Sequence, residues 1–168
     1  MITKTLTTIV KRLFSGNTAV NSVNNSVVDD LDIERYLGDW YEIARYDHPF
    51  ERGIEHSRAH YEKSPDGTIS VTNTGIKDGK TKIAHGKAKL TDESARLRVS
   101  FFGPFYADYR VMKIDAAYTY ALVGSGGAEY LWILSRTKVL PDAAKRELLD
   151  EAKRRGYDTG KLIWVRQE

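Results

Sequence analysis

The chain has 168 residues, the length of one domain with a full hydrophobic core. Its apolar and charged fractions, 41% and 29%, are those of an ordinary globular domain. A net charge of +3, with no basic strip interleaved with aromatics, argues against nucleic acid as a partner. The lack of cysteine excludes disulfides, thiolate catalysis, thiolate metal sites and acylation of a cysteine.

Residues 1–14 carry an apolar stripe opposite lysines, the pattern of a basic amphipathic helix. The stripe consists of Ile2, Leu6, Ile9 and Leu13. Such a helix can lie on a membrane surface, and a disordered or packed extension is the alternative. Residues 15–30 are rich in Asn and Ser and are typical of a linker. We therefore expect an extension and linker over 1–30 and a folded domain over 31–168.

Eight short strands follow one helical turn at 32–37, each separated from the next by a turn signal. The predicted strands span 39–47, 56–63, 68–75, 80–90, 96–102, 106–114, 117–124 and 129–135. Asp78-Gly79 is the clearest hairpin signal, and Gly103-Pro104 marks another turn. A helix from Pro141 to Gly156 and a last strand at 161–165 complete the chain. Consecutive strands of this kind predict an all-β fold, an eight-stranded up-and-down antiparallel barrel with one C-terminal helix.

Three residues are expected to close the barrel at one end. The Gly38-x-Trp40 motif opens the first strand, and Arg136 directly follows the eighth. A guanidinium can lie over an indole face and so tie the first strand to the last. Gly38 allows the chain to turn tightly beneath the barrel. Their role is therefore predicted to be structural rather than ligand-binding.

A closed barrel of this size can hold a ligand, so the inward strand faces are the candidate site. Alternation in the first strand places Trp40, Glu42, Ala44 and Tyr46 on one face, which we take as inward. Glu42 would then be a buried carboxylate that needs a partner. The predicted cavity wall consists of Ala44, Tyr46, Tyr61, Val71, Tyr109, Val111, Trp132 and Leu134.

No arrangement in the sequence indicates catalysis or metal binding. His56 and His60 share a strand face with Arg58 between them, but they would lie about 13 Å apart, too far to share one ion. We expect that strip to face solvent, with contact to an anionic head group as the alternative. The motifs of nucleophilic hydrolases and nucleotide-binding loops are missing, and we expect neither an enzyme nor a cofactor.

Several motifs together resemble the lipocalin family. The general lipocalin signatures correspond to Gly38-x-Trp40, Asp115-x-x-Tyr118-x-x-Ala121 and Arg136. Three further segments resemble the bacterial branch in particular, namely Tyr41-Glu42-Ile43-Ala44-Arg45, Ser100-Phe101-Phe102-Gly103-Pro104-Phe105 and residues 130–136. The resemblance covers about residues 31–166.

The resemblance implies a calyx with a helix on its side and a pocket for a fatty acid or lysophospholipid, linked to membrane maintenance. The bacterial members are typically outer-membrane lipoproteins, whereas this sequence has no cysteine to acylate. We therefore favour the cytoplasm or a peripheral membrane position, with the periplasm or outer membrane as the alternative. The competing functions are an enzyme acting on a bound lipid or isoprenoid and a structural envelope module. A monomer or homodimer is expected.

Overall fold

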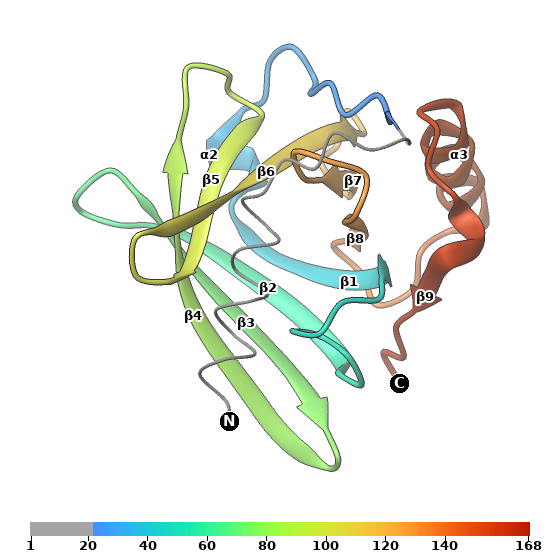
Figure 1. Ribbon diagram of the computed structural model, residues 1–168, viewed down its shortest axis with the longest axis horizontal. Helices are drawn as coiled ribbons and strands as arrows, with labels where there is room; N and C mark the ends of the chain where they lie inside the picture. The colour runs from blue at the N-terminus through green and yellow to red at the C-terminus, as the bar shows by residue number, and fades with distance from the viewer. Residues whose placement is uncertain (1–21) are drawn as a thin grey trace.

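The computed structural model describes residues 22–168, and a closed antiparallel barrel dominates it (Figure 1). The eight barrel strands are β1 (Gly38–Tyr46), β2 (Glu55–Lys63), β3 (Ile69–Lys77), β4 (Lys80–Leu90), β5 (Arg96–Phe102), β6 (Phe105–Ile114), β7 (Tyr120–Gly124) and β8 (Leu131–Ser135). Each strand pairs with the next along the chain, and β1 pairs with both β8 and β2, which closes the sheet. The predicted up-and-down barrel is confirmed.

Helix α2 (Ile33–Tyr36) lies just before β1, where one helical turn was expected. Asp32 caps it by accepting hydrogen bonds from the backbone N–H groups of Glu34 and Arg35. Strand β7 begins later than predicted. The Asp115 carboxylate accepts from the backbone N–H groups of Thr119 and Tyr120 and holds residues 116–119 in a turn.

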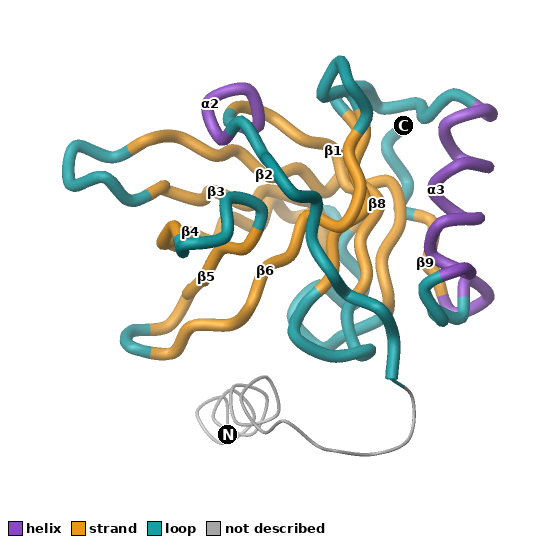
Figure 2. The backbone as a smooth tube through the Cα atoms, turned by 90° about the horizontal axis from the view of Figure 1, so that it is seen from above, coloured by secondary structure: helices purple, strands orange, loops and turns teal. Residues whose placement is uncertain are grey.

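Helix α3 (Asp142–Arg154) packs on the outside of the barrel (Figure 2). One face of the helix, formed by Ala144, Leu148 and Ala152, is buried there against outward-facing strand residues such as Leu122 and Ile133. A single 3-10 turn, η1 (Thr159–Lys161), leads into β9 (Leu162–Trp164), which pairs with β1. The fold thus has two cores, one inside the barrel and one beneath α3. None of the helices within residues 22–168 is long and apolar enough to cross a membrane.

A bulge at Ile43 corrects the predicted inward face of β1. Glu42 pairs with Leu134 of β8, but the next pair is Ala44 with Ile133, so Ile43 is an extra residue on β1. One extra residue turns every later side chain to the opposite face. Ala44 and Tyr46 therefore lie outside the barrel, in the core beneath α3, and not in the cavity.

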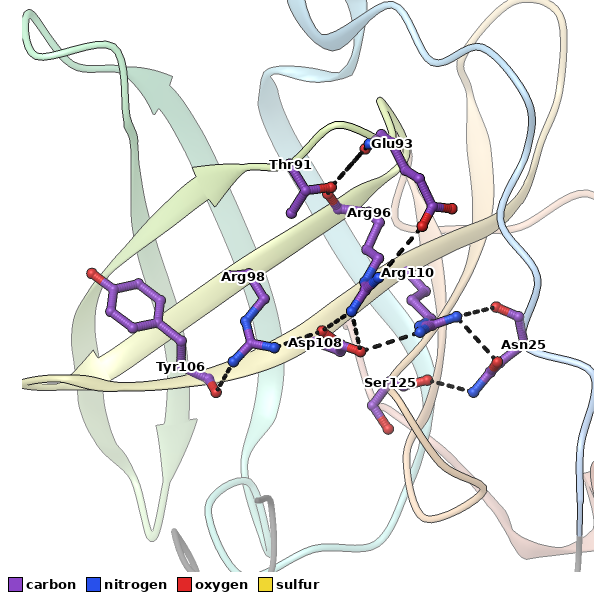
Figure 3. A network of polar contacts seen from close by, with 9 residues as sticks. All are labelled: Asn25, Thr91, Glu93, Arg96, Arg98, Tyr106, Asp108, Arg110 and Ser125. Carbon is purple, nitrogen blue, oxygen red and sulfur yellow. Dashed lines mark hydrogen bonds and ion pairs between the residues drawn. The ribbon is translucent and has the colours of Figure 1, made fainter. Parts of the chain in front are cut away.

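Residues 22–30 also differ from the expected linker, because they pack along the barrel. Asn25 donates from its side-chain amide to the Ser125 carbonyl and accepts from Arg110 (Figure 3). Arg155, which follows directly after α3, donates to the carbonyls of Asn24 and Ser26. This stretch is consequently part of the folded domain, while the expectations for residues 1–21 lie outside the described residues.

An aspartate surrounded by arginines supports this attachment on the outer face of β5 and β6 (Figure 3). Asp108 forms ion pairs with Arg96, Arg98 and Arg110, at nitrogen–oxygen distances of 3.4, 3.1 and 3.2 Å. Burial alone would raise the pKa of Asp108, but the hydrogen bond from Arg110 and the three positive charges outweigh it and lower the pKa. The carboxylate therefore stays charged and orients Arg110 toward Asn25.

Candidate functional site

The barrel encloses a cavity of about 670 Å³ that opens at the end opposite α2. Five of the predicted wall residues border it, namely Tyr61, Val71, Tyr109, Trp132 and Leu134. Val111 faces the barrel interior but is fully buried in the packed core rather than in the cavity wall. Ala44 and Tyr46 lie outside for the reason given above. The wall is mostly apolar and aromatic, with polar groups gathered near the mouth.

The closed end is built from the predicted pair. The Arg136 guanidinium lies 3.8 Å from the centroid of the Trp40 ring, and Trp40 is fully buried. Arg136 also donates to the carbonyls of Arg35, Asp39 and Tyr118. Gly38 has a φ of +93°, and a Cβ there would lie 3.5 Å from Arg136 Nη1. Glycine at this position allows the positive φ, which a residue with a side chain rarely adopts.

Three tyrosine hydroxyls lie in the interior next to this plug. Tyr109 exchanges hydrogen bonds with Tyr36 and with Tyr61, the latter at 3.0 Å between the oxygens. Burial raises the pKa of Tyr61 to about 12 and raises those of Tyr36 and Tyr109 well above 10. The three hydroxyls therefore remain uncharged at neutral pH. The deep end of the cavity accordingly presents neutral aromatic groups.

A buried acid–base cluster forms one side of the cavity. Glu42 faces inward, as predicted, and its partner is Arg45, with 2.8 Å between Nη1 and Oε1. The bulge brings Arg45 to this side, where it also lies 3.5 Å from the Glu51 carboxylate. Burial and the nearby charge of Glu51 raise the pKa of Glu42 well above its ordinary value, despite the opposing effect of Arg45. Glu42 is thus biased toward its protonated, neutral form.

His48 completes this side of the cavity and was missed as a site residue. Its ring packs against Tyr130 and Trp132, with centroids 5.3 and 5.8 Å away. Nε2 lies 3.4 Å from Glu51 Oε2, and neither ring nitrogen has a hydrogen-bond partner within residues 22–168. Burial lowers the pKa of His48 to about 4, so the ring is neutral near pH 7. Sequence pattern marks His48 only as the end of a strand before Pro49.

The other histidines do not gather at a site. His60 Nδ1 lies 2.9 Å from the Asp39 carboxylate, and its side chain is exposed, as expected for the strip. Arg58 is exposed as well but also borders the cavity, and a register shift between Glu55 and Arg58 separates His56 from the other two. Within the described part of the chain, no three His, Cys, Asp or Glu side chains are placed so that they could hold one metal ion.

An enclosed apolar cavity in an eight-stranded calyx, plugged at one end and open at the other, defines a class of proteins that bind hydrophobic molecules. Residues 31–167 match the family described as a lipocalin-like domain. The chain belongs to the lipocalin family, and its resemblance to the bacterial branch is confirmed.

Relatives from bacteria and plants support this assignment. The outer membrane lipoprotein Blc of Escherichia coli K12 is 48% identical over 146 residues, which are 84% of this chain and 82% of that protein. The corresponding lipoprotein of Vibrio cholerae is 44% identical over 84% of this chain and 85% of its own length. Temperature-induced lipocalin-1 of Arabidopsis thaliana is 39% identical over 81% of this chain and 79% of its own.

Solved structures show the same fold at low sequence identity. Insecticyanin from the tobacco hornworm Manduca sexta superposes with a TM-score of 0.70 at 21% identity, covering 84% of each chain. Lobster apocrustacyanin A1 superposes with a TM-score of 0.68 at 22% identity, covering 82% of this chain and 80% of its own. These similarities concern the architecture alone.

Proposed function

We propose that this protein binds one lipid-like molecule, a fatty acid or lysophospholipid, and carries or stores it in support of membrane maintenance. The observation that carries the proposal is the cavity of about 670 Å³, which is enclosed by apolar and aromatic side chains and open at one end. The names of the bacterial relatives, outer membrane lipoproteins, favour a ligand derived from membranes.

Acyl chains suit such a wall because each buried methylene contributes roughly 0.8 kcal/mol to binding. Longer chains should therefore bind more tightly than short ones until the cavity is filled, with dissociation constants of about micromolar order. Titration with a fluorescent fatty acid, followed by competition with unlabelled acids of increasing length, measures this directly. Lack of saturable, competable binding would exclude the proposal.

The identity of the natural ligand requires a second experiment. Mass spectrometry of lipids extracted from the protein purified from its native cells should show one or a few enriched species. An enzyme acting on a bound lipid or isoprenoid is the competing function, and chemical turnover of the added lipid during the same incubation would identify it. An unchanged lipid recovered in stoichiometric amounts supports the carrier.

We further propose that the protein works in the cell envelope. The sequence alone favoured the cytoplasm or a peripheral membrane position, but the relatives named above give the cytoplasm no support. Fractionation of native cells with an antibody against the protein tests this location. Recovery in the soluble cytoplasmic fraction alone would contradict it.

A further inference from the structure

The mouth of the calyx is open on one side as well as at its end. Strand β4 pairs with β5 only from Lys87 to Leu90, whereas it pairs with β3 from Lys80 to Ala88. Residues 80–86 of β4 have no strand partner on the β5 side within the described chain. The β3–β4 hairpin consequently projects past the β5–β6 hairpin (Figure 1). The cavity reaches the gap between them, because its wall includes Ala84 and Phe101.

Apolar side chains are exposed along the two borders of this gap. Ile83 on β4 is 59% exposed, and Phe102 and Phe105 at the tip of β5–β6 are 40% and 53% exposed. All three also border the cavity. Large apolar side chains gathered around a mouth differ from scattered surface residues and indicate contact with another apolar phase.

The same border carries an excess of positive charge. Lys77, Lys80 and Lys82 all line the mouth, and Asp78 is the single acidic residue in that hairpin. Residues 76–83 therefore hold three positive charges and one negative charge, a net of +2. Lysines beside exposed aromatic and aliphatic side chains match the interface of a membrane with anionic lipids.

An unpaired strand edge could instead pair with the same edge of a second copy. Antiparallel pairing of two β4 edges would bring Lys80 and Lys82 close to the lysines of the other copy, and this repulsion opposes the contact. Lysines at an edge are a common protection against such pairing. Lipid phosphates, by contrast, complement the charge and leave the apolar tips buried.

We propose that this rim, formed by the β3–β4 and β5–β6 hairpins, docks on the surface of an anionic lipid bilayer. Phe102, Phe105 and Ile83 enter the interface, and Lys77, Lys80 and Lys82 contact the lipid phosphates. The gap beside β4 then faces the lipid, so an acyl chain can pass between bilayer and cavity without crossing water. The docking proposal depends only on the exposed side chains of the rim, whereas the exchange of lipid rests on the proposed function.

Co-sedimentation of the full chain with vesicles tests the docking surface. Vesicles of phosphatidylcholine with phosphatidylglycerol are compared with vesicles of phosphatidylcholine alone. The combined substitution Lys80→Glu/Lys82→Glu should lower partitioning onto the anionic vesicles at least about tenfold, because it replaces two positive charges near the lipid phosphates by negative ones. Phe102→Ser should lower partitioning onto both kinds of vesicle.

A matched control lies at the other end of the barrel. Lys138 and Val139 follow β8 and are exposed, Val139 by 70%. The combined substitution Lys138→Glu/Val139→Ser should leave partitioning within about twofold. The proposal would be overturned if the control lowered vesicle partitioning as much as the rim variants do. It would also be overturned if the rim variants partitioned like the unchanged protein.

Two further measurements distinguish an effect on membrane docking from a loss of folding and from an effect on ligand binding in the cavity. Lys80→Gln/Lys82→Gln provides a milder rim change, and thermal melting verifies that each variant is folded. Fluorescent fatty-acid titration of the same proteins reports on the cavity. Rim-dependent docking without cavity binding supports docking and contradicts the carrier, whereas cavity binding with rim-independent partitioning supports the carrier and contradicts docking.

Discussion

The Arg136 guanidinium lies 3.8 Å from the centroid of the Trp40 ring and ties the end of β8 to the start of β1. The same guanidinium donates to four backbone carbonyls around α2 and the closed end, those of Arg35, Tyr36, Asp39 and Tyr118. The Trp40 indole in turn donates to the Tyr36 carbonyl at 2.8 Å. This plug is remote from the open mouth, so stability and ligand binding should respond differently when it is altered.

Replacement of Arg136 by alanine should lower the free energy of unfolding by about 3 kcal/mol while changing ligand affinity by less than about threefold. The loss combines the contact with Trp40 and the hydrogen bonds to carbonyls. Thermal or urea unfolding and fatty-acid titration are run on the same variant. Arg35→Ala is the matched control. Arg35 lies over the Tyr118 ring on the exposed surface, so its loss should lower the free energy of unfolding less. Unchanged melting with collapsed affinity would contradict the structural role.

The bulge at Ile43 predicts opposite effects for two aromatic residues. Trp132→Ala should weaken binding of a long fatty acid at least about tenfold, because Trp132 borders the cavity. Tyr46→Phe should leave affinity unchanged and cost about 1 kcal/mol of stability, since its hydroxyl donates to the Asp158 carbonyl beneath α3. Titration and urea unfolding of both variants provide the comparison. Weaker binding in the Tyr46 variant would place that side chain in the cavity after all.

The neutral His48 should make the protein less stable in acid. Burial lowers the pKa of His48 from 6.5 to about 4, so the unfolded chain binds more protons between these values. Its contribution to stability is therefore present above about pH 6.5 and is lost as pH falls toward 4. Glu42, whose pKa is raised, acts in the opposite direction, because the folded state holds its proton as pH rises.

Comparison with His48→Gln isolates the contribution of the histidine. When the pH is lowered from about 7.5 to about 5, the free energy of unfolding of the unchanged protein should fall by about 2 kcal/mol more than that of the variant. Both proteins keep the ionisable groups around the ring, which are Glu42, Arg45, Asp47, Glu51 and Arg52. Urea unfolding at the two pH values measures the difference. Parallel pH dependence of both proteins would show that His48 titrates normally.

Residues 1–14 are predicted to add a second, weak contact with membranes, a prediction that concerns residues outside the described part of the chain. Leu6→Ser/Leu13→Ser in the full chain should reduce partitioning onto anionic vesicles several-fold, and added salt should reduce it further. Thr5→Ser/Thr8→Ser is the matched control within the same segment. Equal partitioning of the leucine variant and the unchanged protein would leave the segment as an ordinary extension.

The sequence by itself determined the architecture and its closed end. Each strand alternates locally and is followed by a turn signal such as Asp78-Gly79, so the number and order of strands do not depend on distant contacts. The Gly38-x-Trp40 motif and Arg136 occupy fixed positions relative to the first and last barrel strands, which made their contact predictable.

Only the tertiary structure decided which side chains meet the cavity. Alternation cannot reveal the extra residue Ile43, because a bulge depends on the pairing of β1 with β8, about ninety residues away in the chain. That bulge removed Ala44 and Tyr46 from the predicted wall and brought Arg45 to Glu42. Likewise, the polar composition of residues 24–26 predicts a linker, because their partners Arg110 and Arg155 come much later in the sequence. Local pattern determines elements, whereas long-range pairing determines which face of each element becomes the site.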